Sequence, residues 1–251
     1  MNRTERTISS ACGNIRLEGM TVPGTVRDSM RRCLEDDAIF DFAVIYIAGA
    51  RAGYRSLHKV ERSSDDPYCY EGTRVPVNKL NIRDLDVLTT KMRDVVPLRI
   101  AELEMHPITK AMSSGYFRDI HRHLYGDIFS WAGEYRTEDY SDRPKDCRAI
   151  HIGTCVDGLF DDLRKRDFLS DSPSLSDDLA HLICELSAIS PFRIGNDVSI
   201  RVLANCIAIM NGKYLDFSKA SESLMDIALS HGIAADYRPM EEIIGEIMED
   251  Y

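Results

Sequence analysis

The chain has 251 residues, of which 44% are hydrophobic and 29% are charged, a composition typical of a soluble globular protein. Its 41 acidic and 31 basic side chains give a formal net charge of −10, which argues against a nucleic-acid binder because phosphate backbones attract clustered Lys and Arg. The amino terminus lacks a signal-like apolar segment, and the longest apolar run, at 42–50, is too short to cross a bilayer. We therefore expect a cytoplasmic protein that does not bind membranes.

The seven cysteines are scattered and show no Cys-x-x-Cys or Cys/His spacing, so we expect no metal site. Cys184 and Cys206 fall within apolar helical patterns, which predicts that they are buried free thiols. An odd number of unpaired cysteines is typical of a reducing compartment.

The first 55 residues predict a small unit of three helices. The first helix is expected to end at Gly19, and the second to cover 24–34. A third carries apolar residues at helical spacing and ends near Gly49 or Gly53. Residues 56–80 contain Pro, Gly, Ser and charges without periodicity, which favours a linker.

The rest of the chain, residues 81–251, predicts a mainly helical domain with one hairpin. A long helix is expected from Asn81 to Met105, and a second carries Phe117, Ile120 and Leu124 on one face. WAGEYRTEDY and RAIHIG, around a turn-rich stretch, are expected to form a β-hairpin. Further helices are predicted at 154–166, 174–189, 197–211, 217–231 and 238–250.

The stretch SPFRIGNDVSIR, residues 190–201, lies between two of these apolar helices. Pro191 and Gly195 interrupt the first helix, and Asn196 or Asp197 is expected to cap the second. A tight turn that opens a buried helix gathers backbone N–H groups, which can bind an anion such as phosphate. The same pattern also fits an ordinary connection between two helices.

SPFRIGNDVSIR resembles the active-site loop of the Fic (filamentation induced by cAMP) family, whose pattern is H-P-F-x-[D/E]-G-N-G-R-x-x-R. HRHLYGDIFSWAGEYRT, at 121–137, resembles a second family signature, and DPYCYEG and NKLNIRDLDVL resemble the entry to its bacterial toxin branch. The resemblance covers about residues 66–235. It implies a helical bundle with a β-hairpin flap that positions a target segment, and transfer of AMP from ATP to a protein hydroxyl with Mg²⁺. Its nucleotide-loop residues would be Phe192, Gly195, Asn196 and Arg201.

Four positions depart from the family pattern. Ser190 stands where the family has the His that acts as general base, and a Ser hydroxyl is not basic near pH 7. Ile194 replaces the carboxylate that would hold Mg²⁺, and an alkyl side chain cannot ligate a hard cation. Asp197 replaces the second Gly, and Val198 the Arg that follows it. The resemblance therefore implies a degenerate catalytic site.

GNIRLEG and the stretch after it resemble the small helical antitoxins of Fic toxins, whose inhibitory pattern is [S/T]-x-x-x-E-[G/N]. Asn14 stands at the Ser/Thr position, while Glu18 and Gly19 match. The resemblance implies that Glu18 pairs with Arg201 and obstructs the ATP γ-phosphate. It implies an antitoxin-like segment and a Fic-like domain joined in one chain. The alternative is a short exposed helix with no special role.

We therefore predict a mainly α protein with an antitoxin-like unit (1–55), an entry segment (56–80) and a Fic-like domain (81–251). We expect a pseudoenzyme that binds or regulates either a protein target or a related Fic protein, docked on the flap at about 133–153, with no cofactor. One alternative is an active enzyme autoinhibited by Glu18, either an AMP transferase that uses ATP and Mg²⁺ or another nucleotide or group transferase that modifies a protein hydroxyl. The other alternative is an adaptor that uses the flap edge alone. The remaining polar candidates are expected to be surface or flap-supporting residues (His121, His123), an incomplete ligand pair (His181, Glu185) and a core anchor (Trp131).

Overall fold

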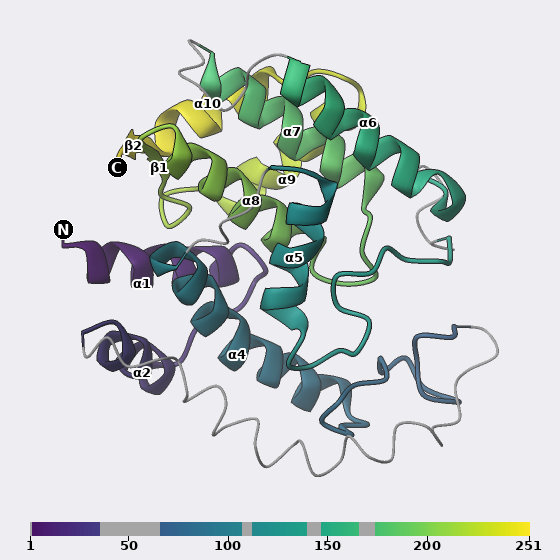
Figure 1. Cartoon of the computed structure of the whole chain (residues 1–251). Helices are drawn as coiled ribbons and strands as arrows, with labels where there is room; N and C mark the ends of the chain where they lie inside the picture. Colours follow the sequence, from purple (N-terminus) through teal and green to yellow (C-terminus); the bar gives the residue numbers. More distant parts are fainter. Residues whose placement is uncertain (1, 36–65, 107–111, 140–146, 166–173) are drawn as a thin grey trace.

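The computed structural model describes residues 2–35, 66–106, 112–139, 147–165 and 174–251, and these form a mainly helical protein (Figure 1). The helices are α1 (Arg3–Arg16), α2 (Gly24–Glu35), α4 (Leu85–Met105), α5 (Ser114–Tyr125), α6 (Ile152–Lys165), α7 (Leu175–Ile189), α8 (Asn196–Met210), α9 (Glu222–Ile233) and α10 (Arg238–Ile247). A 3-10 turn, η2 (Ala149–His151), precedes α6. No helix within the described ranges has the length and apolar content needed to span a membrane.

Polar side chains fix where several helices begin. Asn2 Oδ1 accepts a hydrogen bond from the Glu5 amide at 2.8 Å at the start of α1. Asp84 does the same for Val87 at 3.0 Å in α4, and Ser113 for Tyr116 at 3.2 Å in α5. Such caps satisfy N–H groups that have no partner inside the helix, and each contributes about 1 kcal/mol.

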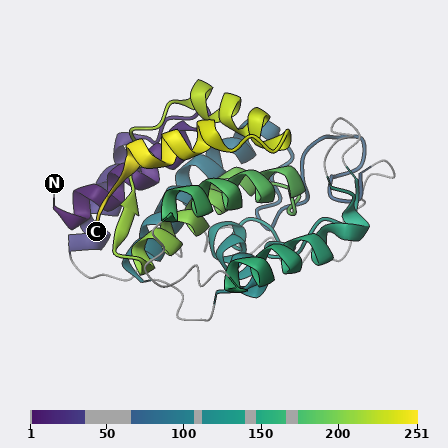
Figure 2. The same ribbon diagram turned by 90° about the horizontal axis from the view of Figure 1, so that it is seen from above.

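The central helix is α7, which packs against α6, α8, α9 and α10. Seen from above, the yellow helix α10 lies along the green helix α7 (Figure 2). Cys184 on α7 and Cys206 on α8 are buried free thiols, as predicted. The chain also forms one small antiparallel sheet, in which β1 (Lys213–Leu215) pairs with β2 (Met248–Asp250).

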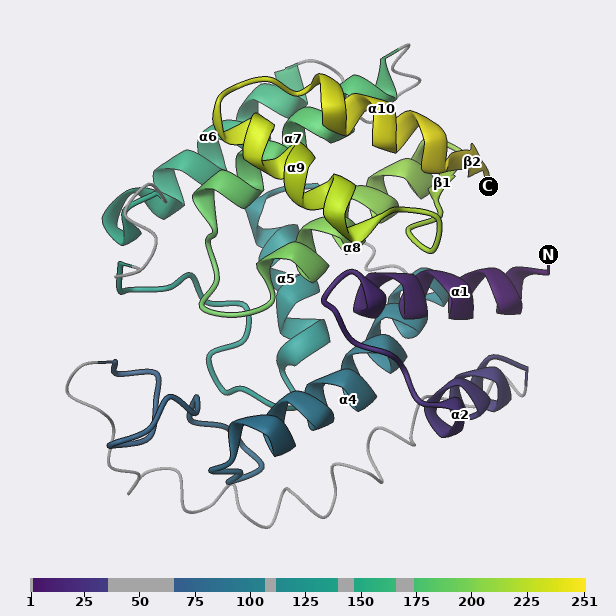
Figure 3. The ribbon, with the colours of Figure 1, turned by 180° about the vertical axis from the view of Figure 1, so that it is seen from behind.

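Helix α1 packs against α2, α4 and α8, as the view from behind shows (Figure 3). Its buried residues Ile8, Ala11 and Ile15 belong to the same hydrophobic core as the helices that follow. A Cβ on Gly13 would lie 2.5 Å from the Ser218 nitrogen, so glycine is what allows α1 to approach the loop after β1. The third helix predicted in this unit lies outside the described residues.

The long helix begins at Leu85 rather than Asn81 because the Asn78 side chain organises a turn before it. Asn78 Oδ1 accepts hydrogen bonds from the amides of Leu80 and Ile82 at 3.2 and 3.0 Å. Its Nδ2 donates to the carbonyls of Pro76 and Ile82 at 2.9 and 2.7 Å. This local network competes with helix formation, and Asn81 takes a left-handed conformation with φ of 53°.

The predicted β-hairpin is wrong where its flanks are described. Residues 131–139 contain turns without a strand, and residues 149–165 form η2 and α6. The RAIHIG alternation is too short to compete with the helical stripe of Ile152, Val156 and Phe160, which packs into the core. The backbone N–H groups of the first flank find other partners: Arg136 donates to Pro191 O and Thr137 donates to Tyr68 Oη, each at 2.9 Å. The turn-rich stretch between the flanks lies outside the described residues up to 146.

A buried carboxyl group, Glu104, links α1, α4 and α8. Glu104 Oε1 accepts hydrogen bonds from Ser10 Oγ at 2.5 Å and from Asn205 Nδ2 at 3.0 Å. Its Oε2 is buried with no hydrogen-bond partner among the described residues. Burial, more than the nearby Asp216 charge, raises the pKa of Glu104 to about 8, so the carboxyl group is neutral in the folded protein at pH 7.

Stability should therefore fall as pH rises. Between pH 4.5, the ordinary pKa of this side chain, and about 8, the folded protein keeps a proton that the unfolded chain releases. We expect the free energy of unfolding to decrease by at most about 5 kcal/mol between pH 5 and pH 9 through this group. Glu104→Gln should lack that decrease in urea unfolding measured across the pH range. The exposed Glu246→Gln should follow the wild type, and parallel curves for wild type and Glu104→Gln would contradict the prediction.

Candidate functional site

The connection between α7 and α8 is a tight loop with two left-handed residues. Ser190 ends α7 with φ of 46°, and Gly195 precedes α8 with φ of 76°. A Cβ on Gly195 would lie 2.3 Å from the Tyr125 ring, so only glycine fits both the backbone conformation and the space. Phe192, which lies between Ser190 and Gly195 in the sequence, is fully buried. Its ring stacks on His121, with ring centroids 3.8 Å apart. The first half of the loop, residues 190–192, is therefore packed in the core, and residues 193–195 are partly exposed.

Asn196 closes this loop on itself. Its Oδ1 accepts a hydrogen bond from the Phe192 amide, and its Nδ2 donates to the Phe192 carbonyl, both at 2.8 Å. The expectation that Asn196 or Asp197 caps α8 is wrong, because Gly195 is the capping residue and makes no side-chain bond. The Asn196 amide group is used inside the loop instead.

Arg136, which the sequence analysis did not single out, holds the end of α7. Its guanidinium is buried and donates to the Ser190 carbonyl through Nε at 2.9 Å and to the Ile189 carbonyl through Nη2 at 3.4 Å. It also donates to the carbonyls of Glu138, at 2.8 Å, and of Cys147. A cation at a helix C-terminus is stabilised by the carbonyl groups left unpaired there.

His121 is fully buried, which corrects the expectation of a surface residue. Its Nδ1 accepts a hydrogen bond from the Gly133 amide at 2.8 Å, so Nε2 carries the proton and donates to the Ile194 carbonyl at 2.9 Å. Burial lowers the pKa of His121 to about 4, which keeps the ring neutral. His121 therefore connects the segment after α5 to the loop at 190–195. Trp131 packs beside it against Phe129, with centroids 4.5 Å apart, as expected of a core anchor.

The four positions that depart from the family pattern have side chains suited to packing or to solvent. The Ser190 hydroxyl donates to the Ser187 carbonyl at 2.7 Å. Ile194 packs against the hydrophobic core, and Val198 is 2% exposed within α8. Asp197 is exposed in the first turn of α8, where a carboxylate is favourable. None of the four offers an imidazole or a carboxylate directed into the loop.

Arg201 joins this loop region to the N-terminal segment. Its Nη2 lies 2.6 Å from Glu18 Oε1 and 3.0 Å from the Asn14 carbonyl, and its Nε donates to Asn14 Oδ1 at 3.0 Å. The predicted pairing of Glu18 with Arg201 is thus present, although the two residues are 183 positions apart. Gly19, with φ of 70°, follows in the turn after α1. The Arg201 side chain is 5% exposed and that of Glu18 is 27% exposed, so bulk water screens this pair only in part.

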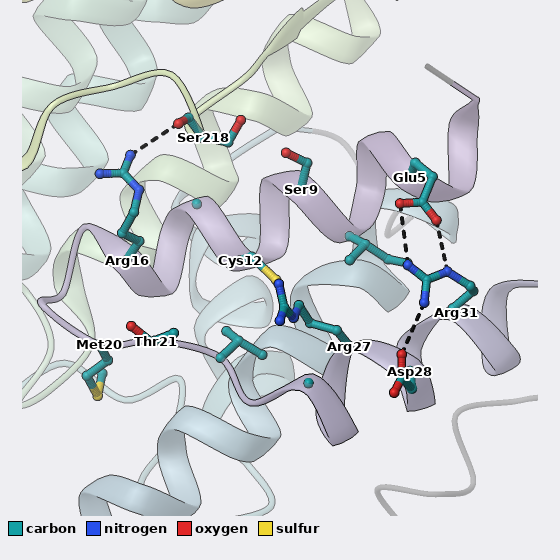
Figure 4. A pocket seen from close by; sticks show the side chains of 14 residues that line it. Glu5, Ser9, Cys12, Arg16, Met20, Thr21, Arg27, Asp28, Arg31 and Ser218 are labelled. Atoms are coloured by element: carbon teal, nitrogen blue, oxygen red, sulfur yellow. Dashed lines mark hydrogen bonds and ion pairs between the residues drawn. The ribbon is translucent and has the colours of Figure 1, made fainter.

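A cavity of about 710 Å³ lies between α1 and α2 (Figure 4). Most of its charged groups already have partners: Arg31 pairs with Glu5 at 2.9 Å and with Asp28 at 3.1 Å. Arg16 Nη2 donates to the Ala220 carbonyl at 2.5 Å and to the Ser218 carbonyl at 3.3 Å. These contacts anchor the end of α1 near the Glu18 turn, and the cavity is separate from the loop at 190–195.

The other polar candidates are separate from the loop. His123 lies 3.1 Å from Glu102, and the His181 ring packs edge-on against Tyr237, with centroids 4.8 Å apart. The Tyr237 hydroxyl donates to Glu185 at 2.7 Å. Within the described ranges, no group of three His, Cys, Asp or Glu side chains could hold a metal ion.

Comparison with known proteins matches residues 111–208 to the Fic/DOC family. The chain is 29% identical over 188 residues to the Escherichia coli (strain K12) protein named "Probable protein adenylyltransferase Fic", which covers 74% of this chain and 93% of the relative. It is 27% identical over 165 residues to protein adenylyltransferase VbhT of Bartonella schoenbuchensis, covering 64% of this chain and 34% of VbhT. The structure of BepC from Bartonella tribocorum, with bound AMPPNP, superposes with a TM-score of 0.65 at 23% identity, covering 73% of this chain and 97% of that chain. The likeness to BepC establishes the fold.

Two glycine substitutions test how tightly the loop is packed. Gly195→Ala should lower the free energy of unfolding by at least about 2 kcal/mol, since it adds a Cβ to a left-handed residue against the Tyr125 ring. Gly158→Ala is the matched control within α6, where a Cβ meets no atom within 4 Å, and it should stabilise the protein by about 0.5–1 kcal/mol. Chemical denaturation measures both, and equal effects would contradict the packing described for Gly195.

Proposed function

Because this chain contains a Fic/DOC-family domain at 111–208 and is homologous to Fic protein adenylyltransferases, we propose that it is a catalytically degenerate member of that group with a built-in antitoxin-like segment. In this proposal it has lost AMP transfer and serves as a binding or regulatory protein. Its partner would be either a protein target or a related Fic protein, docked on the segment at about 133–153.

The observation that carries the loss of AMP transfer is that Ser190 and Ile194 supply neither a general base nor a metal ligand, and the built-in antitoxin-like segment rests on the contact of Arg201 with Asn14 and Glu18. The Arg201 guanidinium, which would face a nucleotide phosphate in the family resemblance, donates its hydrogen bonds to the N-terminal segment instead. An arginine held by a carboxylate with little exposure to water forms a strong, directional pair. This supports a structural role for the ion pair, which holds the turn after α1 against α8.

The loop also lacks groups suited to the family's chemistry. General-base catalysis needs a group that can take a proton near pH 7, and the Ser190 hydroxyl instead donates to a carbonyl of its own helix. Magnesium prefers oxygen ligands, whereas Ile194 offers an alkyl side chain that packs against the core. The residues present do not fit Mg²⁺, and we derive no reaction step through Mg-ATP.

The second candidate is an active transferase, which would use ATP and Mg²⁺ and be autoinhibited by Glu18. The ion pair between Glu18 and Arg201 also favours this candidate, because an inhibitory segment requires a carboxylate that pairs with Arg201 and can be displaced. The retained scaffold of Phe192, Gly195 and Asn196 is compatible with both candidates.

Binding of Mg-ATP separates the two. We expect the purified protein and its Glu18→Gly variant to show no increase in melting temperature with Mg-ATP, since removing Glu18 takes the carboxylate away from Arg201 but supplies no metal ligand. Thermal unfolding with and without Mg-ATP measures this effect. The control is Glu71→Gly, which removes an exposed carboxylate from another turn.

ATP-dependent label transfer by Glu18→Gly, abolished in the double variant with Asn196→Ala, would favour the active transferase and refute the pseudoenzyme. Ser190→His in the Glu18→Gly background should not restore transfer, because Ile194, Asp197 and Val198 remain. The label is followed on added protein and on the chain itself, so that self-modification is detected as well.

A further inference from the structure

Two cysteines on either side of η2 lie in contact. Cys147 Sγ and Cys155 Sγ are 3.8 Å apart and only eight positions apart in sequence. A disulfide has an S–S bond of about 2.0 Å, so the sulfurs need to approach by roughly 1.8 Å for the bond to form. Neither thiol lies in the core: Cys155 is exposed and Cys147 is partly buried.

We propose that Cys147 and Cys155 are a redox-active pair that a hydroperoxide converts to a reversible disulfide. The exposed Cys155 thiolate attacks the peroxide O–O bond and becomes a sulfenic acid, releasing hydroxide from hydrogen peroxide. The Cys147 sulfur then attacks the Cys155 sulfur, forming the S–S bond and releasing water. The hydroxide takes up the proton that Cys155 lost when it ionised. The two thiols thus lose two electrons in total, and hydrogen peroxide is reduced to two molecules of water.

The order of attack follows from the surroundings of each thiol. The thiolate is the nucleophile, and burial together with the neighbouring Cys155 raises the pKa of Cys147 to about 11. Cys147 therefore suits the second step, in which it attacks a sulfur already in contact with it. Cys69, Cys184 and Cys206 are buried, so hydrogen peroxide reaches them slowly in the folded protein.

The bond would tie α6 to the end of α7. Cys155 lies in the first turn of α6, whereas the Cys147 backbone is bound next to the loop at 190–195. The Cys147 amide donates to the Ala188 carbonyl at 3.4 Å, and its carbonyl accepts from Arg136, which also holds Ser190. The disulfide would therefore form next to the loop at 190–195. This inference does not depend on the proposed function.

Alkylation and mass measurement test the pair. The reduced full chain is treated with a small excess of hydrogen peroxide, quenched, unfolded and alkylated with iodoacetamide. We expect five alkyl adducts instead of the seven that the seven cysteines give when reduced, and dithiothreitol should restore seven. Trypsin should release the segments 146–148 and 149–164 as one cross-linked species that reduction separates.

Two variants make the test specific. Cys155→Ser should lose thiols at least about tenfold more slowly and form no internal cross-link, because Cys147 has lost its contacting sulfur. Cys12→Ser is the matched control, and its cross-link should form as in the wild type, leaving four adducts of six. The proposal is overturned if the wild type keeps seven adducts, gains oxygen without a cross-link, or pairs other cysteines, or if Cys155→Ser behaves like the wild type.

Discussion

The backbone of residues 190–195 imposes the constraint on which the rest of the structure depends. It connects two buried helices, and a buried carbonyl or amide group left without a partner costs about 1–3 kcal/mol. Two side chains from distant parts of the chain supply partners, Arg136 for Ser190 and His121 for Ile194, and the neighbouring Asn196 supplies those of Phe192. The positions of α5, of the segment after it and of α8 are therefore coupled through this loop.

Because of that constraint, the residues of this loop that maintain the fold are different from the residues that the family pattern assigns to catalysis. The loop positions that match the family pattern are structural here, because Gly195 is the residue that fits against Tyr125 and Asn196 closes the turn. The positions that depart from the family pattern are compatible with the same backbone, since the Val198 side chain is buried and the Asp197 side chain is exposed to solvent. A family match that rests on the structural positions is therefore evidence for the fold, and activity must be measured separately.

The sequence was sufficient where long apolar stripes decide the structure, as in α7 and α8, whose predicted limits agree with the observed ones within about one residue. It failed for the hairpin, where a short alternation competes with tertiary contacts that periodicity does not describe. The roles of Arg136 and His121 were missed because their partners are backbone carbonyls, which have no sequence signature. Glu104 was missed as well, because buried residues lie on every side of the second half of α4 and periodicity does not single out its carboxyl group.

The contacts of α1 limit how Arg201 could be released. Removing the whole helix would expose Ile8 and Ile15, at about 1.5–3 kcal/mol each, and would remove Ser10 from the buried Glu104. Glu18, by contrast, lies beyond the end of α1, in a turn where Glu18 and Gly19 are exposed and Leu17 is buried. A partner that displaces this turn, residues 17–20, would therefore remove the Glu18 carboxylate from Arg201 while α1 stays in the core, and Asn14 in α1 would keep its two hydrogen bonds to the guanidinium.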